Sequence, residues 1–284
     1  MNQHVTACID ESHYAGAVCD AAAWASLRLD APLTFIHAID RTARPATADV
    51  SGQIGLGSRE HLLEELAQLD EKRGKLAQEQ GRLMLDAACE RARTDGVAEP
   101  MSRQRNGELV ETLVGIEDTI RLLVLGKRGE TGAAAVDHLG SNLERVIRSL
   151  HCPILITPDT FTPPTRVLVA FDASDTARRM VKRIAASPIA RGIEGHLVFV
   201  GEPSTHIERE LEQARRQLAG VCASVTVEIV SGEVESTLRA YKQANDIEML
   251  VMGAYGHSRV RQLLVGSTTT QMIRRARMPL LIMR

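Results

Sequence analysis

Glycine and hydroxyl residues near the end of the chain recur at a spacing suited to phosphate binding. Gly253 is followed by two residues and Gly256, and then by nine residues and the run Gly266-Ser267-Thr268, which opens a predicted helix. Glycine lets the backbone approach a ligand closely, and the first turn of a helix presents free N–H groups to an anion. The spacing predicts a loop for a triphosphate tail, although such glycines also occur in simple tight turns. His257 is either a phosphate contact or a solvated loop residue.

The same pattern occurs earlier in the chain. Gly126 is followed by two residues and Gly129, and then by ten residues and Gly140-Ser141. The second interval is one residue longer here, so we expect a different geometry around a phosphate. Two such loops in one chain are a stronger indication of binding than an isolated glycine pair.

One aspartate closes the first predicted strand of each half, Asp10 in VTACIDES and Asp172 in VLVAFDAS. In a five-stranded parallel sheet of order 3-2-1-4-5, right-handed crossovers leave a crevice beyond the carboxyl ends of strands 1 and 4. Strand 4 is expected to end at Gly126 in one half and at Gly253 in the other. The acid and the glycine loop should therefore meet, unless the aspartate only caps the following helix.

The chain is an internal repeat. The segment GSNLERVIRSLHCPILI from Gly140 aligns without gaps with GSTTTQMIRRARMPLLI from Gly266, and IRLLVLGKRG from Ile120 aligns with IEMLVMGAYG from Ile247. The order of the matching segments is the same in both halves. A length of 284 residues suits two domains of roughly 100–150 residues each.

Each half alternates short apolar runs with longer helical patterns, which predicts βαβ units, a parallel sheet and an α/β fold. The proline-rich run PDTFTPPT, residues 158–165, suits a stiff linker. We therefore expect domains at residues 1–158 and 165–284. The predicted strands lie at about 4–9, 33–39, 98–105, 121–126 and 153–157, and at about 166–171, 195–201, 223–231, 247–253 and 279–283.

The first half carries a longer helical insertion at about residues 41–96. Four leucines, Leu62, Leu69, Leu76 and Leu83, recur in it every seven residues. This repeat indicates either a coiled-coil partner or a helix that covers its own sheet and then runs past it. We favour the second interpretation.

The pattern G-2x-G-9x-G-[ST], with an aspartate closing strand 1, resembles the nucleotide-binding members of the universal stress protein family. The resemblance covers nearly the whole chain, in tandem, and implies a Rossmann-like fold of the adenine nucleotide alpha hydrolase type in each half. It implies ATP as ligand, with or without Mg²⁺, and a role in survival under stress. It does not identify the stress or the regulated partner.

The resemblance also implies roles for individual residues. Asp172 would contact the adenosine end of the ligand, and Gly253 and Gly256 would let the backbone pass close to ribose and phosphate. Gly266 with Ser267 would bind the phosphates. The matching residues of the first half are Asp10, Gly126, Gly129, Gly140 and Ser141.

Composition argues against several partners. The formal net charge of −2 offers no field for recruiting nucleic acid or an anionic membrane. No apolar run approaches the ~20 residues that span a bilayer, and the segment MNQHVTACIDES lacks a signal-peptide pattern. The five cysteines are scattered without a CxxC pair, as buried thiols in a reducing compartment are. We expect a cytoplasmic protein without a metal site.

Other functions fit less well. A dehydrogenase would need G-x-G-x-x-G after strand 1, and a P-loop ATPase would need G-x-x-x-x-G-K-[ST]; neither pattern occurs in the required place. A receiver-type phosphoacceptor would cluster acids beside Asp10 or Asp172, and the two copies share no such cluster. We therefore expect a protein that binds ATP and is not a rapid enzyme. A nucleotide-free interaction module with decayed pockets stays open as the alternative.

The last strand of each half, in PILITP and PLLIMR, is an apolar edge that would invite aggregation if exposed. In tandem members of the family the two halves typically pack as a pseudo-dimer through these strands. We expect residues 154–156 to run antiparallel beside residues 280–282, and a homodimer stays open.

Charge distinguishes the two glycine loops. The second loop carries Arg259 and Arg261 without an acid, so we expect the second half to bind ATP more tightly. The first loop sets two bases against two acids, namely Lys127, Arg128, Glu130 and Asp137.

Overall fold

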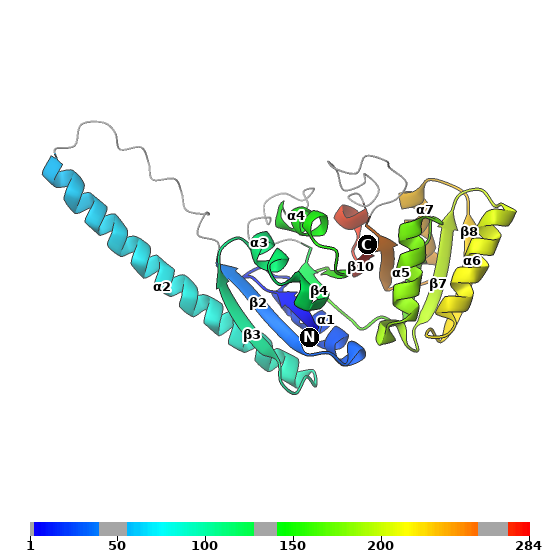
Figure 1. The fold of residues 1–284 in the computed structure, drawn as a ribbon, viewed down its shortest axis with the longest axis horizontal. Helices are drawn as coiled ribbons and strands as arrows, with labels where there is room; N and C mark the ends of the chain where they lie inside the picture. The colour runs from blue at the N-terminus through cyan, green and yellow to red at the C-terminus, as the bar shows by residue number, and fades with distance from the viewer. Residues whose placement is uncertain (1–2, 40–55, 128–140, 255–271) are drawn as a thin grey trace.

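The computed structural model describes residues 3–39, 56–127, 141–254 and 272–284. Five strands in each half build the sheet (Figure 1). In the first half they are β1 (His4–Cys8), β2 (Leu33–Ile39), β3 (Met101–Asn106), β4 (Ile120–Gly126) and β5 (Ile154–Thr157). In the second half they are β6 (Arg166–Ala170), β7 (Glu194–Val200), β8 (Ser224–Val230), β9 (Met249–Gly253) and β10 (Leu280–Met283).

Helices connect these strands on both sides of the sheet. Those of the first half are α1 (Ala15–Leu29), α2 (Leu56–Thr94), α3 (Leu109–Val114), the 3₁₀ turn η1 (Glu117–Thr119) and α4 (Ser141–Ser149). Those of the second half are α5 (Asp175–Ala185), the 3₁₀ turn η3 (Pro188–Ala190), α6 (Thr205–Leu218), α7 (Val234–Ala244) and a helical turn over 272–275.

The ten strands form one sheet in the order β3-β2-β1-β4-β5-β10-β9-β6-β7-β8. Within each half the strands are parallel, and their order is 3-2-1-4-5 when they are counted from the start of that half. The predicted fold class and strand order are confirmed in both halves. In each half of the sheet the chain therefore changes winding direction between the first and fourth strands, where a crevice is expected.

The two halves join through their last strands. β5 and β10 are antiparallel, with Leu155 opposite Leu281 and Ile156 opposite Leu280. These side chains are at most 1% exposed. The predicted pseudo-dimer pairing is confirmed, and it removes both apolar edges from water.

Helix α1 adds a second contact between the halves. Its Arg28 donates from Nε to the backbone oxygen of Ile189 in η3 at 3.3 Å. Its Trp24 ring lies 5.6 Å, centroid to centroid, from Phe161 in the linker. The linker and η3 are thereby held against the first half.

Two apolar layers cover the sheet. On one face, helices α1, α2, α5 and α6 contribute Val18, Leu85, Met180 and Leu211 to a single buried cluster. On the other face, α3, α4 and α7 contribute Leu113, Val146 and Leu238. Alternate side chains of each central strand enter opposite layers, as a doubly covered parallel sheet requires.

The long helix α2 covers its own sheet only near its carboxyl end. Leu85 and Cys89 are buried against the sheet, whereas Leu69, Leu76 and Leu83 are 50%, 64% and 54% exposed. The helix runs on past the edge strand β3 (Figure 1). The helix thus covers its own sheet and runs past it, as in the favoured interpretation, while Leu69, Leu76 and Leu83 face solvent and leave a coiled-coil partner as the alternative. Among the helices described, none is both long and apolar enough to cross a membrane.

The predicted start of the third strand, at residue 98, is wrong by three residues because β3 begins at Met101. Gly96 adopts φ +98° and ends the preceding helix, and Val97 N–H returns to the Ala92 oxygen at 2.9 Å. Pro100 has no N–H to offer a neighbouring strand. The chain therefore pairs only from Met101 onward.

Candidate functional site

The two predicted aspartates occupy equivalent turns. Asp10 lies two residues beyond β1, and its Oδ1 accepts the Ser12 N–H at 3.1 Å. Asp172 lies two residues beyond β6, and its Oδ1 accepts the Ser174 N–H at 3.0 Å. Each carboxylate is thus fixed by its own turn at the carboxyl end of the first strand of its half.

The fourth strand of each half ends beside this turn. Ala7 of β1 lies opposite Val124 of β4, and Val169 of β6 lies opposite Val251 of β9. Two residues further along these registers, the strand ends reach Gly126 in the first half and Gly253 in the second. Each glycine therefore stands next to the residue that precedes the aspartate, as the predicted crevice requires.

In the second half, the first turn of a helix follows the aspartate closely and lies against the glycine. Helix α5 begins three residues after Asp172, and Ser174 caps it by accepting the Ala177 N–H at 3.1 Å. A Cβ placed on Gly253 would come 3.1 Å from Cγ2 of Thr176, in the first turn of α5. The end of β9 and the positive end of the α5 dipole therefore lie in close contact. This arrangement suits an anion or a polar ligand over the strand ends.

The first half lacks this arrangement. Helix α1 begins five residues after Asp10, and its N-cap residue Tyr14 makes no side-chain capping bond. Ser12 occupies the place of Ser174, and its Oγ is a buried polar atom without a hydrogen-bond partner in the described part of the chain. The two crevices therefore differ in where the helix dipole begins and in how the serine is used.

The phosphate-loop residues predicted from the sequence mostly lie outside the described residues. Ser141 begins α4, but its side chain is not among those described. The same holds for the whole of Gly129, Gly140, Gly256, His257, Gly266, Ser267 and Thr268, and for Arg128, Glu130, Asp137, Arg259 and Arg261. The described site thus consists of the aspartate turns, the strand ends and the helix starts.

Lys127 has a role that its sequence position does not reveal. Its Nζ donates to the backbone oxygens of Arg274 at 2.5 Å and Ala276 at 2.8 Å, both in the second half. Its positive charge therefore lies at the carboxyl end of the 272–275 helical turn, where the helix dipole favours a cation. One signal in the sequence could have indicated this role. Lys127 directly follows β4, which lies beside β5, the strand that pairs with the second half.

Ser174 and Thr176 are also absent from the predicted set. The repeat places Ser174 and Ser12 in the same position after the aspartate, and this match could have singled them out. The close approach of Thr176 to Gly253 follows only from the packing of α5 on β9.

Comparison with known proteins agrees with this geometry. Residues 1–158 and 164–284 each match the profile of the universal stress protein family. A universal stress protein of Synechocystis is 33% identical over 286 residues, covering 99% of this chain and 100% of the relative.

Two solved structures share the fold over 99% of this chain. A universal stress protein from Archaeoglobus fulgidus has a TM-score of 0.68 at 19% identity, with 97% of its own chain covered. A putative universal stress protein from Pseudomonas aeruginosa has a TM-score of 0.63 at 15% identity, with 93% covered. At these identities the likeness concerns the fold alone.

Proposed function

The chain belongs to the universal stress protein family, and from this premise we propose that it binds ATP as a regulatory ligand in a stress response without turning it over rapidly. The domains that carry this function are residues 1–158 and 165–284. In this proposal both domains act in the cytoplasm, and neither nucleic acid nor a membrane is a partner. The regulated partner is a separate question from the ligand.

The observation that carries the proposal is the convergence in the second half. Asp172, Gly253 and the first turn of α5 meet at the carboxyl ends of β6 and β9. An adenosine needs a hydrogen-bonding group for its ribose, and a phosphate chain needs bare backbone and N–H donors. The sequence supplies the second requirement in the run from Gly256 to Thr268.

The strand end also fits a nucleotide sterically. Gly253 already lies against Thr176, so a side chain at residue 253 would push into the helix start or into the crevice. A glycine keeps that passage open at the place where ribose and the first phosphate would lie. In this proposal Gly253 and Gly256 line the passage, and His257, Gly266, Ser267 and Thr268 hold the phosphates. Mg²⁺, where it accompanies ATP, would bind the phosphate oxygens.

We propose that the first half is the weaker site. Asp10, Gly126, Gly129, Gly140 and Ser141 repeat the pattern, but α1 begins later after its aspartate than α5 does. In addition, Lys127 is bound to carbonyl oxygens of the second half, which takes one positive charge out of the first loop. The acids Glu130 and Asp137 then outweigh the bases there.

Rapid catalysis has little support in the described site. Cys8, at the end of β1, has a thiol pKa that is raised by burial and further by the charge of Asp10. Such a thiol is not a thiolate nucleophile at neutral pH. No cluster of three or more metal-ligating side chains occurs among the described residues. A binding role requires neither group.

The alternative is a nucleotide-free interaction module. Among the described residues, the Ser12 hydroxyl has no partner and the start of α1 has no side-chain cap, and these two facts favour it for the first half only. In the second half, the capped helix and the close glycine argue for a retained site.

Nucleotide content of the purified full-length protein tests the proposal. The protein is denatured, and its small molecules are separated by chromatography and identified by mass. We expect adenine nucleotide at up to one or two equivalents, and calorimetry of the emptied protein should show heat of ATP binding with and without Mg²⁺. Nucleotide-free protein without such heat would establish the interaction module instead.

Variants locate the site. Asp172→Ala should weaken ATP binding, and Asp172→Asn tests the charge separately because an amide oxygen can still accept the Ser174 N–H. Thermal unfolding of each variant without nucleotide checks that the fold is kept. If Asp172→Ala and Asp10→Ala both leave ATP binding unchanged, the ligand lies elsewhere.

A further inference from the structure

The two halves of the sheet differ on the face covered by α3 and α7. Helix α7 extends over Val234–Ala244, whereas its counterpart α3 ends at Val114 and is followed by the turn η1. In the second half, the Tyr241 hydroxyl lies 2.9 Å from Nδ1 of His196 in β7. Tyrosine and histidine rings thus fill the space between α7 and the sheet.

The strand registers show what occupies these places in the first half. Val5 and Val167 are equivalent in the repeat, and they pair with Leu33 and Gly195, so Thr34 stands in the place of His196. By the same count Thr6 stands in the place of Leu168. Two bulky side chains are replaced by threonines, and α3 ends before the turn that carries Tyr241 in α7.

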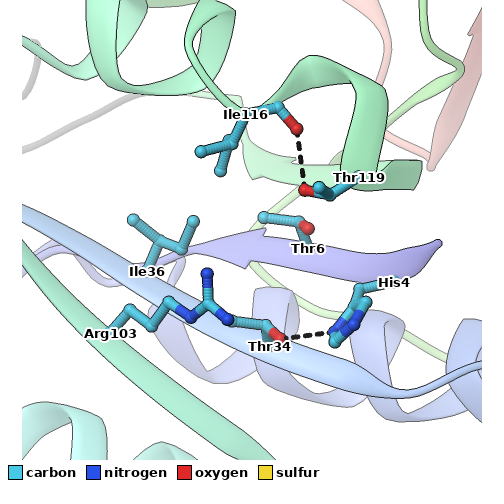
Figure 2. A pocket seen from close by; sticks show the side chains of 7 residues that line it. All are labelled: His4, Thr6, Thr34, Ile36, Arg103, Ile116 and Thr119. Atoms are coloured by element: carbon cyan, nitrogen blue, oxygen red, sulfur yellow. Dashed lines mark hydrogen bonds between the residues drawn. The ribbon is translucent and has the colours of Figure 1, made fainter. Parts of the chain in front are cut away.

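A hollow of about 260 Å³ remains between η1 and the strands β1, β2 and β3 (Figure 2). Thr6 is only 2% exposed, and in the described part of the chain its hydroxyl makes no hydrogen bond. Thr34 Oγ1 lies 2.9 Å from Nδ1 of His4, and Thr119 Oγ1 donates to the Ile116 oxygen at 2.7 Å. Within the described residues, the Thr6 hydroxyl therefore has no protein partner and lines a hollow large enough for a ligand.

Arg103 supplies a positive charge to this hollow. It comes from the edge strand β3, and its guanidinium is turned toward Thr34 and Thr6 (Figure 2). Among the described residues it forms no ion pair with an acid, and Glu228 stands in its place in the second half. Burial, together with this positive charge, lowers the pKa of His4. Within the part of the chain that the structure describes, the hollow is therefore lined by a basic group without a countercharge.

An apolar surface completes the lining. Ile36 is 1% exposed on β2, and Ile116 faces it from the segment between α3 and η1 (Figure 2). A ligand here would contact a guanidinium group and hydroxyls on one side and branched aliphatic carbons on the other. This combination selects for a charged group attached to a hydrocarbon part.

We propose that this hollow binds a small aliphatic carboxylate, with its carboxylate on the Arg103 guanidinium and the Thr6 hydroxyl and its carbon chain against Ile36 and Ile116. A guanidinium fork matches a carboxylate with two parallel hydrogen bonds. The hollow of about 260 Å³ has room for a ligand of this size.

This site is separate from the nucleotide crevice. His4 begins β1 and Thr119 immediately precedes β4, so the hollow lies toward the amino ends of the parallel strands. Asp10 and Gly126 lie beyond the carboxyl ends of the same two strands. One molecule can therefore hold both ligands, and loss of one site leaves the other testable.

Nuclear magnetic resonance titration of the ¹⁵N-labelled full-length protein with sodium butyrate tests the proposal. We expect saturable amide shifts confined to β1, β2, β3 and η1, with a Kd on the order of millimolar, as befits a ligand of few atoms. Arg103→Gln should weaken binding about tenfold, since a charged hydrogen-bond partner is lost. Thr6→Val keeps the side-chain volume, removes the hydroxyl and should also weaken binding.

Matched controls decide the outcome. Arg105→Gln removes the same charge two residues further along β3, on the same face but outside the hollow, and should leave butyrate binding unchanged. Butyramide, which lacks the charge, should give no saturable shifts. The proposal is overturned if butyramide binds as butyrate does, if inorganic phosphate binds as tightly, if Arg105→Gln weakens binding as much as Arg103→Gln, or if butyrate gives no saturable shifts.

Discussion

Arg284 donates from Nη1 to the backbone oxygen of Leu150 at 2.8 Å, so a residue of the second half holds the end of helix α4 in the first. The converse contact also exists, because Lys127 of the first half donates to the Ala276 oxygen at 2.8 Å. Leu150 and Ala276 are equivalent in the gapless alignment from Gly140 and Gly266. Each half thus places a cation at the carboxyl end of the other half's last helix, where the helix dipole is negative.

Removal of either cation should destabilise the join between the halves. Arg284→Met and Lys127→Met should each lower the free energy of unfolding by about 1–2 kcal/mol, the range for a charged donor lost from backbone acceptors in a part-buried place. Urea unfolding followed by circular dichroism measures this. Arg277→Met is the control, because Arg277 is exposed and makes no side-chain hydrogen bond in the described part of the chain. A loss as large in Arg277→Met would contradict the capping role.

The same substitution at two leucines compares the buried β5–β10 contact with the exposed part of α2. Leu281→Ala should cost about 2–5 kcal/mol, since Leu281 is 1% exposed against Leu155 and its removal leaves a cavity. Leu76→Ala is the same chemical change at a position 64% exposed on α2 and should alter stability by no more than about 0.5 kcal/mol. Urea unfolding compares the two variants. A large loss in Leu76→Ala would mean that the leucine stripe is covered by a partner in solution.

The two nucleotide sites should differ in affinity within one molecule. Calorimetric titration of the full-length protein with ATP should show a tighter and a weaker step, roughly tenfold or more apart, because the second loop has surplus positive charge. Asp172→Ala should remove the tighter step, and Asp10→Ala should affect only the weaker one. Two equal steps, or binding confined to the half that contains Asp10, would refute the assignment.

We expect the protein to hydrolyse bound ATP slowly or not at all. Turnover is expected to lie below ~1 s⁻¹, the lower end of ordinary enzyme rates. Release of inorganic phosphate from ATP in excess over the protein measures it. Faster turnover that is abolished by both Asp172→Ala and Gly266→Ala would make the protein an enzyme and end the binding-protein interpretation. Asp10→Ala serves as the comparison from the other half.

Lowering the pH should reduce the stability of the second half, because His196 takes up a proton. Burial lowers the pKa of His196, and the nearby charges of Glu194, Arg166 and Glu228 modify it. The unfolded chain then takes up this proton more readily than the folded one, so stability is complete above about pH 6.5 and falls as the pH drops through the folded pKa.

The test is the pH dependence of Tm. His196→Gln cannot titrate and can still hydrogen-bond the Tyr241 hydroxyl, so its Tm should fall less than that of the original protein between pH 7 and about pH 5. His206→Gln, at an exposed position in α6, should follow the original curve. Parallel curves for His196→Gln and the original protein would show that His196 does not contribute.

Much of the fold could be predicted from the repeat. Alternation of apolar strands and helices defines parallel βαβ units, and right-handed crossovers then leave few strand orders to consider. The apolar runs at Ile154–Ile156 and Leu280–Ile282 were strand edges that had to be covered, and their pairing follows from that need. Asp10, Asp172, Gly126 and Gly253 could be placed together because the 3-2-1-4-5 order sets the carboxyl ends of strands 1 and 4 side by side.

The rest depended on contacts between residues far apart in the chain. Lys127 counted as a loop charge in the sequence, yet its partners lie 147 and 149 residues away in the other half. The leucine stripe of α2 had two interpretations, because periodicity shows that side chains share a face but not what that face meets. The hollow beside Thr6 arises because a helix is shorter than its counterpart and small side chains replace rings, and only the packed structure turns those differences into space.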